Sequence, residues 1–387
     1  MSNKQYTVLA VEDNKKEENG IYIYDLSSNS YRDESTSFVS LGFTEGADPE
    51  TPRHVESVGN TLWTITRNRI VTLNYEKEEW KNDHISIEEI DESNLLFGDA
   101  QLRGHVTHLN EYHRGVFLTL YKSDSVLTNP ESGKLYFSKS TELHSLDEIS
   151  GITPTGKVHN ANKYLAIPTL NKVTKIPKRD NLFEKLLEGS IDTDHYHPIE
   201  MPDNIMHIDS LDHLLLISDR SENFALQINE ELFEYFNNPN DELMHDPFMT
   251  PGHENLLPME ASSIALAKEE SKYYALFGTD MGKIIVYSID NASGAHRHST
   301  LEFLTMKQKV MEIGKDNRIS GLKFDSGNVH FVLRNYKFAI PLYKLLSPNE
   351  WPQKSENLIS NLNKVYSFNR ILEAPHRISS WTELEVN

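Results

Sequence analysis

Cysteine is absent from this chain of 387 residues. Its absence excludes a disulfide framework, cysteine zinc sites and thiol nucleophiles. It also suits a reducing compartment. The opening segment "MSNKQYTVLAVEDN" has no basic region followed by a long apolar stretch, so we expect no secretory signal and a cytoplasmic or nuclear protein. Long apolar runs are missing as well, and the sequence therefore predicts no membrane span.

Basic residues are few relative to acidic ones. The chain has 38 Lys and Arg against 58 Asp and Glu, which gives a formal net charge of −20. Direct nucleic-acid binding is not expected, because neutralising a phosphate backbone needs Lys and Arg surfaces. The charge favours solubility, or a protein partner that is itself basic.

Several catalytic and nucleotide-binding motifs are also absent. The sequence contains no GxxxxGK[ST], GxGxxG or HExxH pattern and no GxSxG elbow. Carboxylates are too numerous for any pair to be singled out as a glycosidase pair. We therefore predict no catalytic residue and no cofactor.

Histidine is plentiful and occurs in clusters, which are candidate metal sites. The 17 histidines include clusters at His105, His108 and His113, at His195 and His197, and at His296 and His298. On a strand, His105 and His108 would point to opposite faces, and the other two clusters are expected in loops next to turn residues. Surface histidines are the simpler interpretation, so no metal site is predicted.

What the sequence does contain is a repeated hairpin pattern. In "YYALFGTDMGKIIVYSID", two apolar segments of high β-propensity flank Thr279–Gly282, where Asp280 and Gly282 suit a turn. The same pattern occurs seven times, at Tyr6–Leu26, Thr61–Tyr75, Gly115–Lys139, Lys163–Pro177, His213–Asn229, Tyr273–Asp290 and Asn328–Leu345.

A further strand candidate stands immediately before five of these hairpins. The candidates are Thr51–Gly59, His105–His113, Asn204–Asp212, Met259–Glu270 and Arg318–Gly327. One strand followed by a hairpin, repeated along the chain, is typical of propeller blades. We expect an all-β fold, a single seven-bladed β-propeller over residues 1–387, with two stacked β domains as the rival architecture.

Three segments interrupt the strand pattern and are expected to be short helical or acidic insertions, at about 177–203, 229–258 and 346–360. "NLFEKLLEG" has helical spacing, and "NEELFEYF" also begins helically before the segment turns acidic. The tail at 363–387 is expected to close the ring by completing a blade with residues 5–13, since an open ring would expose a strand edge.

These features give the chain a resemblance to the WD40-like β-propeller family. From Gly252 to Asp290, "GH" stands ahead of three strand-like segments that end in "ID", where a WD repeat has Trp-Asp. Tyr24-Asp25 also falls where Trp-Asp would. No Trp-Asp dipeptide occurs in the chain, so the resemblance concerns architecture. It implies a ring of blades and a rigid interaction platform.

We therefore expect a noncatalytic scaffold for protein partners, a subunit of a larger complex, with a basic client as one candidate partner. The segment 229–258 is the first choice for a contact because it carries apolar anchors among acids: Phe233, Tyr235, Phe236, Phe248 and Met249. Packing of these residues on the protein's own surface is the equally weighted alternative. The second hypothesis is an enzyme or ligand-binding propeller with a metal or small-molecule site at the channel mouth.

Overall fold

The computed structural model describes 4–12, 20–25, 37–41, 52–58, 61–66, 69–76, 79–86, 101–109, 115–123, 131–138, 143–145, 152, 154–178, 182, 185, 188, 197–220, 224–228, 231–236, 261–279, 282–290, 294–302, 318–346 and 370–386. The chain divides into two compact units, which we describe separately. Unit 1 comprises Met1–Glu200 with Ala374–Asn387, and unit 2 comprises Met201–Glu373.

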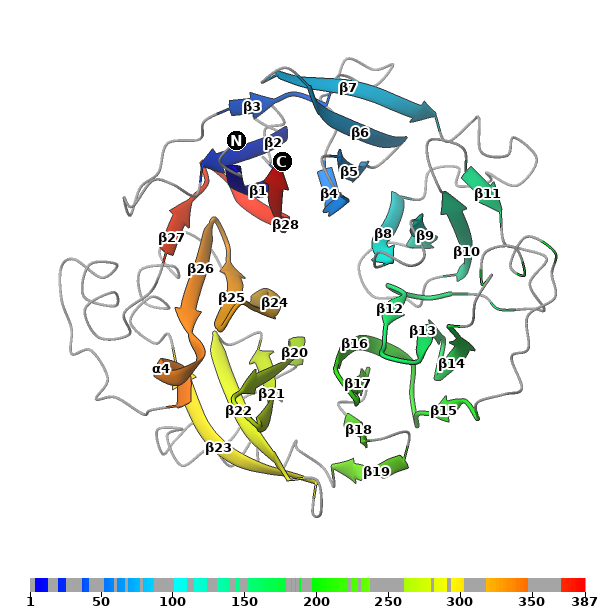
Figure 1. Cartoon of the computed structure of the whole chain (residues 1–387), viewed down its shortest axis with the longest axis vertical. Coiled ribbons are helices and arrows are strands. Elements are labelled where there is room, and N and C mark those ends of the chain that lie inside the picture. The colour runs from blue at the N-terminus through cyan, green and yellow to red at the C-terminus, as the bar shows by residue number, and fades with distance from the viewer. Residues whose placement is uncertain are drawn as a thin grey trace. The chain divides into compact units, whose positions relative to one another are not determined.

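Unit 1 contains four sheets of four strands each, shown in Figure 1. Their orders are β28-β1-β2-β3, β4-β5-β6-β7, β11-β10-β9-β8 and β12-β13-β14-β15. The strands are β1 Lys4–Glu12, β2 Gly20–Asp25, β3 Ser37–Val39, β4 Pro52–Val58, β5 Thr61–Thr66, β6 Arg69–Glu76, β7 Glu79–Ser86, β8 Gln101–Leu109, β9 Gly115–Ser123, β10 Glu131–Ser138, β11 Leu143–Ser145, β12 His159–Asn160, β13 Tyr164–Thr169, β14 Lys172–Pro177, β15 Ile199–Glu200 and β28 Arg377–Val386.

Unit 2 contains three sheets of the same kind, in the orders β16-β17-β18-β19, β20-β21-β22-β23 and β24-β25-β26-β27. The strands are β16 Ile205–Leu211, β17 Leu214–Asp219, β18 Phe224–Ile228, β19 Glu231–Phe236, β20 Ala261–Glu269, β21 Lys272–Thr279, β22 Lys283–Asp290, β23 Gly294–Glu302, β24 Ile319–Asp325, β25 Asn328–Leu333, β26 Tyr336–Pro341 and β27 Arg370–Glu373. One short helix, α4 Leu342–Leu346, follows β26.

The expected hairpins are confirmed, and the turn chemistry explains them. In the quoted hairpin, β21 and β22 pair antiparallel from Tyr273 opposite Ile289 to Gly278 opposite Ile284. Gly282 has a φ of 77°, which glycine adopts without a steric penalty. The strand candidates ahead of five hairpins are also confirmed, as β4, β8, β16, β20 and β24.

Five two-residue turns place a residue other than glycine at positive φ. These are Leu170 (49°), Asp212 (51°), Glu270 (52°), Ser326 (48°) and Arg334 (58°). Each is the first residue between two paired strands. Short hairpin turns need this backbone conformation to match the strand twist. These turns therefore keep residues other than glycine at positive φ, although that conformation carries an energetic penalty for them.

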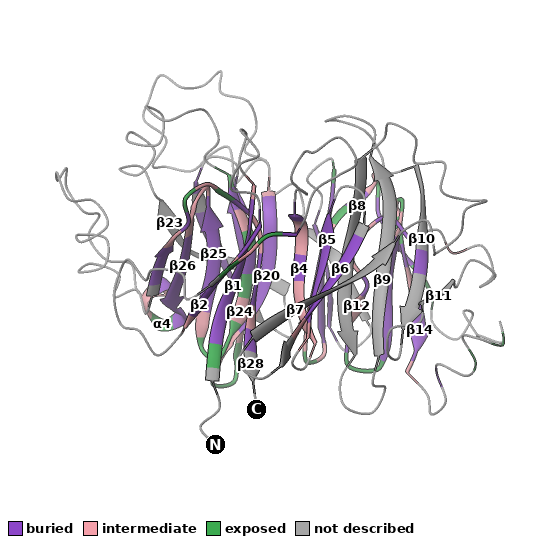
Figure 2. Ribbon diagram, turned by 90° about the horizontal axis from the view of Figure 1, so that it is seen from above, coloured by how far each residue is buried: buried purple, intermediate pink, exposed green. Residues whose placement is uncertain are grey.

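The cores lie between neighbouring sheets within each unit (Figure 2, purple). In unit 1, Ile21 and Ile23 of β2 belong to the same cluster as Leu62 and Val71 of β5 and β6. In unit 2, Phe224 of β18 meets Phe277 of β21 edge to face, with ring centroids 4.6 Å apart. Runs of buried residues such as "LLLISD" in β17 arise because both faces of these strands are covered.

The two ends of the chain share one sheet of unit 1. β28 pairs antiparallel with β1 from Lys4 opposite Val386 to Glu12 opposite Arg377, with a bulge beside Ala10. Thr7 Oγ1 also donates to Glu383 Oε2 at 2.8 Å. These contacts join residues from the first 12 positions to residues from 377 onward, so this sheet depends on both ends of the chain.

The structure corrects the helical interpretation of "NEELFEYF". Glu231–Phe236 is strand β19, the fourth strand of its sheet, paired with β18. Its apolar spacing fits a helix and a bulged strand equally well, and pairing with the buried β18 decides between them. In the 177–203 segment, Leu182 and Lys185 are helical, whereas Ile199–Glu200 forms β15. Most of the 346–360 segment lies outside the described residues.

No helix among the described residues is long and apolar enough to cross a membrane.

Candidate functional site

Side chains on the strands where neighbouring sheets meet form hydrogen bonds from one sheet to the next. We call these the seam strands: β28, β4, β8 and β12 in unit 1, and β16, β20 and β24 in unit 2. Each is the edge strand of its sheet and contacts the seam strand of the next sheet in the same unit. An edge strand has unpaired backbone N–H and C=O groups, which need partners when water is excluded.

In unit 1, side chains of β28 satisfy the backbone of β4. Ser379 Oγ donates to the Ala10 carbonyl on its own sheet (3.2 Å) and to the Pro52 carbonyl at the start of β4 (2.9 Å). Further along, the Val55 N–H donates to Ser380 Oγ (3.2 Å). The next contact is from the Ser57 N–H to Thr382 Oγ1 (3.3 Å).

In unit 2, Ser262 of β20 repeats the arrangement of Ser379. Its Oγ lies 3.1 Å from the Gly278 carbonyl on its own sheet and 2.5 Å from the Ile319 carbonyl at the start of β24. Ser263 Oγ reaches the same Ile319 carbonyl at 3.1 Å. Gly278 is required here, because a Cβ at this position would lie 2.6 Å from Ile319 Cγ2.

The β16–β20 seam uses histidine and aspartate in place of serine. The His207 ring donates to the carbonyl of Ala261, the first residue of β20. Asp209 Oδ2 accepts the Leu266 N–H at 2.7 Å. The first residue of the next seam strand is therefore the acceptor in three seams: Pro52, Ile319 and Ala261.

A β-bulge sits at the start of several seam strands and re-aims one side chain. The extra residue is Arg53 in β4, Met206 in β16, Ser262 in β20 and Ser379 in β28. Bulges commonly re-aim side chains near functional sites. Two of these bulges direct a serine at the neighbouring sheet, whereas Met206 is 56% exposed.

Electrostatics in unit 2 disfavour a charged histidine, both on the seam strand β16 and on β25. Burial, and secondarily the charge of Arg318, lower the pKa of His207 from 6.5 to about 4. Burial, followed by the charges of Lys337 and Lys323, lowers the pKa of His330 to about 2. Lys337 Nζ lies 3.1 Å from His330 Nδ1. Both imidazoles are therefore neutral at physiological pH.

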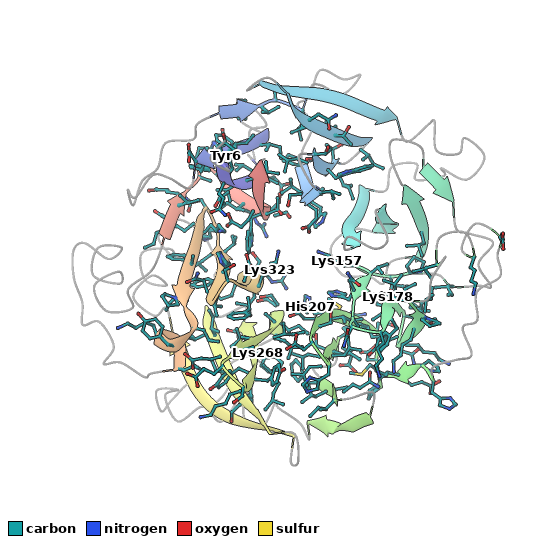
Figure 3. All side chains as sticks on the ribbon, in the orientation of Figure 1. Tyr6, Lys157, Lys178, His207, Lys268 and Lys323 are labelled. Atoms are coloured by element: carbon teal, nitrogen blue, oxygen red, sulfur yellow. The ribbon has the colours of Figure 1, made fainter. Side chains whose placement is uncertain are left out.

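The turn ends of β16 and β20 are joined by an exposed ionic contact. Asp212 Oδ2 accepts a hydrogen bond from Lys268 Nζ at 2.6 Å and another from Tyr273 Oη at 2.8 Å. These two hydrogen bonds lower the pKa of the Asp212 carboxyl, and the bond that Lys268 donates to Asp212 raises the pKa of Lys268. Figure 3 labels Lys268 and His207 on the two strands.

One serine–histidine pair in unit 1 has the residue types of a nucleophile and its base. Ser380 Oγ lies 3.4 Å from His54 Nδ1. This is longer than a productive pair, and Ser380 Oγ already accepts the Val55 N–H. Ser380 therefore contributes a hydrogen bond between neighbouring sheets. Ser379 and Ser262 do so as well, because their hydroxyls donate to backbone carbonyls of the next sheet.

The predicted contact residues fall partly on β19. Phe233, Tyr235 and Phe236 are in this strand, with Phe233 opposite Leu226 and Phe236 opposite Phe224. Leu226 and Phe224 belong to the buried core of unit 2. Phe248 and Met249 lie outside the described residues. The structure thus brings three of the five to one strand, and their role in binding stays a prediction.

The structure places the histidine clusters on separate elements. His105 and His108 are in β8, and His296 and His298 are in β23, where the sequence had suggested a loop. His197 is exposed, while His113 and His195 lie outside the described part. Within that part, no group of three or more His, Asp or Glu side chains could hold a metal ion.

The sequence does not predict the role of the seam residues, because that role depends on the pairing register of the strands. Ser262 and Ser379 become bridging residues only where a bulge turns them toward the next sheet. A Ser-Ser dipeptide near the start of a seam strand, as at Ser262-Ser263 and Ser379-Ser380, is the one signal that the sequence offered.

Comparison with known proteins locates the fold. No protein-family model and no curated protein sequence matches the chain. Among solved structures, Saccharomyces cerevisiae Sqt1 superimposes with a TM-score of 0.50 and 12% identity, over 92% of this chain and 94% of that one. The WD40 β-propeller domain of Doa1 gives a TM-score of 0.48 and 9% identity, covering 88% and 87%.

The likeness to Sqt1 confirms the resemblance to WD40-like β-propeller proteins that the sequence predicted. At this level of identity the likeness concerns the fold.

Proposed function

We propose that this protein is a noncatalytic protein–protein interaction scaffold, built as a single seven-bladed propeller and belonging to a larger complex. The observation that carries the proposal is the use of the seam hydroxyls, imidazole and carboxylate. Ser262, Ser379, His207 and Asp209 each bond the backbone of a neighbouring sheet. Polar groups engaged in this way stiffen the sheets and are not available as nucleophiles or bases.

The seven four-stranded sheets among the described residues, and the pairing of β1 with β28, support the ring. A closed ring would leave only short, protected strand edges. We place the complex in the cytoplasm or nucleus, because a chain without cysteine suits a reducing compartment.

The contact segment remains residues 229–258, with Phe233, Tyr235, Phe236, Phe248 and Met249 as the apolar anchors. A basic client protein is the preferred partner, since the net charge of −20 would speed its association. Steep weakening of the complex between low and high salt would support a basic client, and salt-insensitive binding would count against it.

The deciding experiment is gentle purification from the native source, with mass spectrometry of the protein and metal content. The scaffold proposal expects stoichiometric protein partners and no metal. A lone monomer carrying metal or a small ligand would overturn it in favour of a channel-mouth site.

The contact segment is tested by deleting residues 241–253, with a deletion of equal length at 304–316 as the control. We expect only the first deletion to release the partner while both variants keep the thermal transition of the intact protein. Retention of the partner by the first deletion would refute the assignment.

A further inference from the structure

Met206 on β16 is the most exposed large apolar side chain in the part of the chain that the structure describes. Its exposed fraction is 56%, whereas Ile205 and Ile208 on the same strand are each 7% exposed. Apolar side chains of a strand ordinarily face the core, and these two isoleucines do so. The exposure of Met206 therefore has a local cause.

That cause is the β-bulge at the start of β16. Ile205 lies opposite Asp219 and His207 lies opposite Ser218, so Met206 is the extra residue and has no cross-strand partner. A bulge leaves its extra residue outside the ladder and re-aims the side chain. The bulge thus presents the Met206 thioether to solvent while its neighbours stay paired.

The contact between sheets does not require this exposure. In β20 and β28 the extra residue of the bulge is a serine, whose hydroxyl reaches a carbonyl of the next seam strand, at Ile319 and Pro52. In β16 the corresponding bond comes from the following residue, His207, whose ring donates to the Ala261 carbonyl; Figure 3 labels His207. The side chain of Met206 therefore serves no seam bond and is presented for another role.

The characteristic chemistry of an exposed thioether is two-electron oxidation. The chain has no cysteine, so methionine supplies all of its sulfur side chains. A lone pair on Sδ attacks one oxygen of hydrogen peroxide, the O–O bond breaks, and a sulfur–oxygen bond forms as water leaves. Sulfur is oxidised by two electrons, and the peroxide is reduced to water. The sulfoxide is polar, and methionine sulfoxide reductases reverse its formation.

We propose that Met206 is a site of reversible oxidation, at which peroxide turns an apolar contact surface of the scaffold into a polar one without disturbing the sheet. The sheet is spared because the extra residue of the bulge lies outside the ladder. Met201, which is 3% exposed, provides the contrast, since oxygen added there would have to be buried. The oxidation stands by itself, whereas its effect on a partner rests on the proposed scaffold function.

Peroxide treatment of the purified protein tests the site. The structure describes two of the nine methionines, Met201 and Met206, and cleavage before aspartate separates them into the peptides 194–202 and 203–208. Mass spectrometry over time should show Met206 oxidised at least tenfold faster than Met201 in the folded protein, and both oxidised at the same rate in concentrated urea. Equal rates in the folded protein would overturn the proposal, and so would a difference that persists in urea.

Two variants at this position separate a change of surface from damage to the fold. Met206→Leu keeps an apolar side chain that peroxide does not oxidise, and Met206→Gln imitates the polarity of the sulfoxide. Both should keep the thermal transition of the parent. A lowered transition for Met206→Gln alone would show that the sheet depends on the apolar side chain, which contradicts the proposal.

The effect on a partner is measured with the proteins that native purification recovers. Met206→Gln should weaken their binding at least tenfold, whereas Met206→Leu should bind like the parent. Unchanged binding by Met206→Gln would refute the effect on the contact surface. A lone monomer in the purification would refute the scaffold proposal instead, and the oxidation rates would still decide the modification site.

Discussion

At the scale of single residues, hydroxyl groups form hydrogen bonds that join one sheet to the next. Ser262 and Ser379 occupy equivalent bulges in different units, and each bridges its own sheet to the first carbonyl of the next seam strand. Removing such a hydroxyl leaves two carbonyls without that donor. The penalty should exceed the value of an ordinary exposed hydrogen bond, because buried polar groups without partners are costly.

We therefore expect Ser262→Ala to lower the free energy of unfolding by about 1–3 kcal/mol. Ser271→Ala, in the exposed turn between β20 and β21, should change it by less than about 0.5 kcal/mol. Urea unfolding of the two variants measures the difference. Equal stability of the two would show that the Ser262 bonds contribute nothing net.

His207 gives a residue-scale prediction for pH. Its folded pKa of about 4 lies below its ordinary 6.5, so the unfolded chain binds the proton more tightly. The stability that the neutral ring provides is present above pH 6.5 and is lost as the pH falls toward 4. His207→Gln, which keeps an N–H donor for the Ala261 carbonyl, should reduce this loss. Urea midpoints from pH 7 to pH 4 test it, and parallel pH profiles for parent and variant would contradict it.

At the scale of elements, the hairpins were predictable and the fourth strands were not. The turn at Thr279–Gly282 carries its own signal in Asp280 and Gly282, and strong β-propensity flanks it. The strand β19 carries no such signal, because Leu232, Phe233 and Phe236 fit helical spacing as well as a bulged strand. Its conformation is decided by β18, a tertiary partner that no local pattern contains.

The candidate site was likewise predictable only in part. Aromatic anchors at Phe233 and Phe236 could be picked out from composition, but their places opposite the core residues Leu226 and Phe224 follow only from the register. The seam bonds depend on contacts between segments distant in sequence.

The β24–β25 turn allows a clean measurement of backbone strain. Gly327 has a φ of 79°, and a Cβ built there would meet nothing within 4 Å. Gly327→Ala should thus destabilise the protein by about 1 kcal/mol through conformation alone. The preceding Ser326, at 48°, supplies the converse, since Ser326→Gly relieves strain and should be neutral or mildly stabilising. Thermal unfolding of both variants tests these expectations. An unchanged melting temperature for Gly327→Ala would contradict the predicted strain.

Leu170 adds a second turn prediction. It is 49% exposed at a φ of 49°, and its N–H donates to Thr155 Oγ1. Asparagine tolerates this conformation better than leucine does. Leu170→Asn should raise the melting temperature slightly, whereas a fall would mean that the leucine side chain makes a stabilising contact.

At the scale of the whole molecule, the sheet β28-β1-β2-β3 makes unit 1 dependent on both ends of the chain. Removing residues 374–387 deletes β28 and leaves the edge of β1 without its ladder. We expect hydrogen exchange of the β1 and β2 amides to accelerate at least tenfold, because the strand edge opens to water. Adding a synthetic peptide of residues 374–387 should restore protection. Unchanged protection in the truncated chain would refute this dependence.

The same pairing imposes a waiting time during protein synthesis. The partner of Lys4 is Val386, so β1 leaves the ribosome long before β28 exists. At roughly 5–20 residues per second, translation of the intervening chain takes on the order of 20–75 seconds. Throughout that interval β1 presents an unpaired edge of apolar residues to the cell, which is the kind of surface that chaperones occupy.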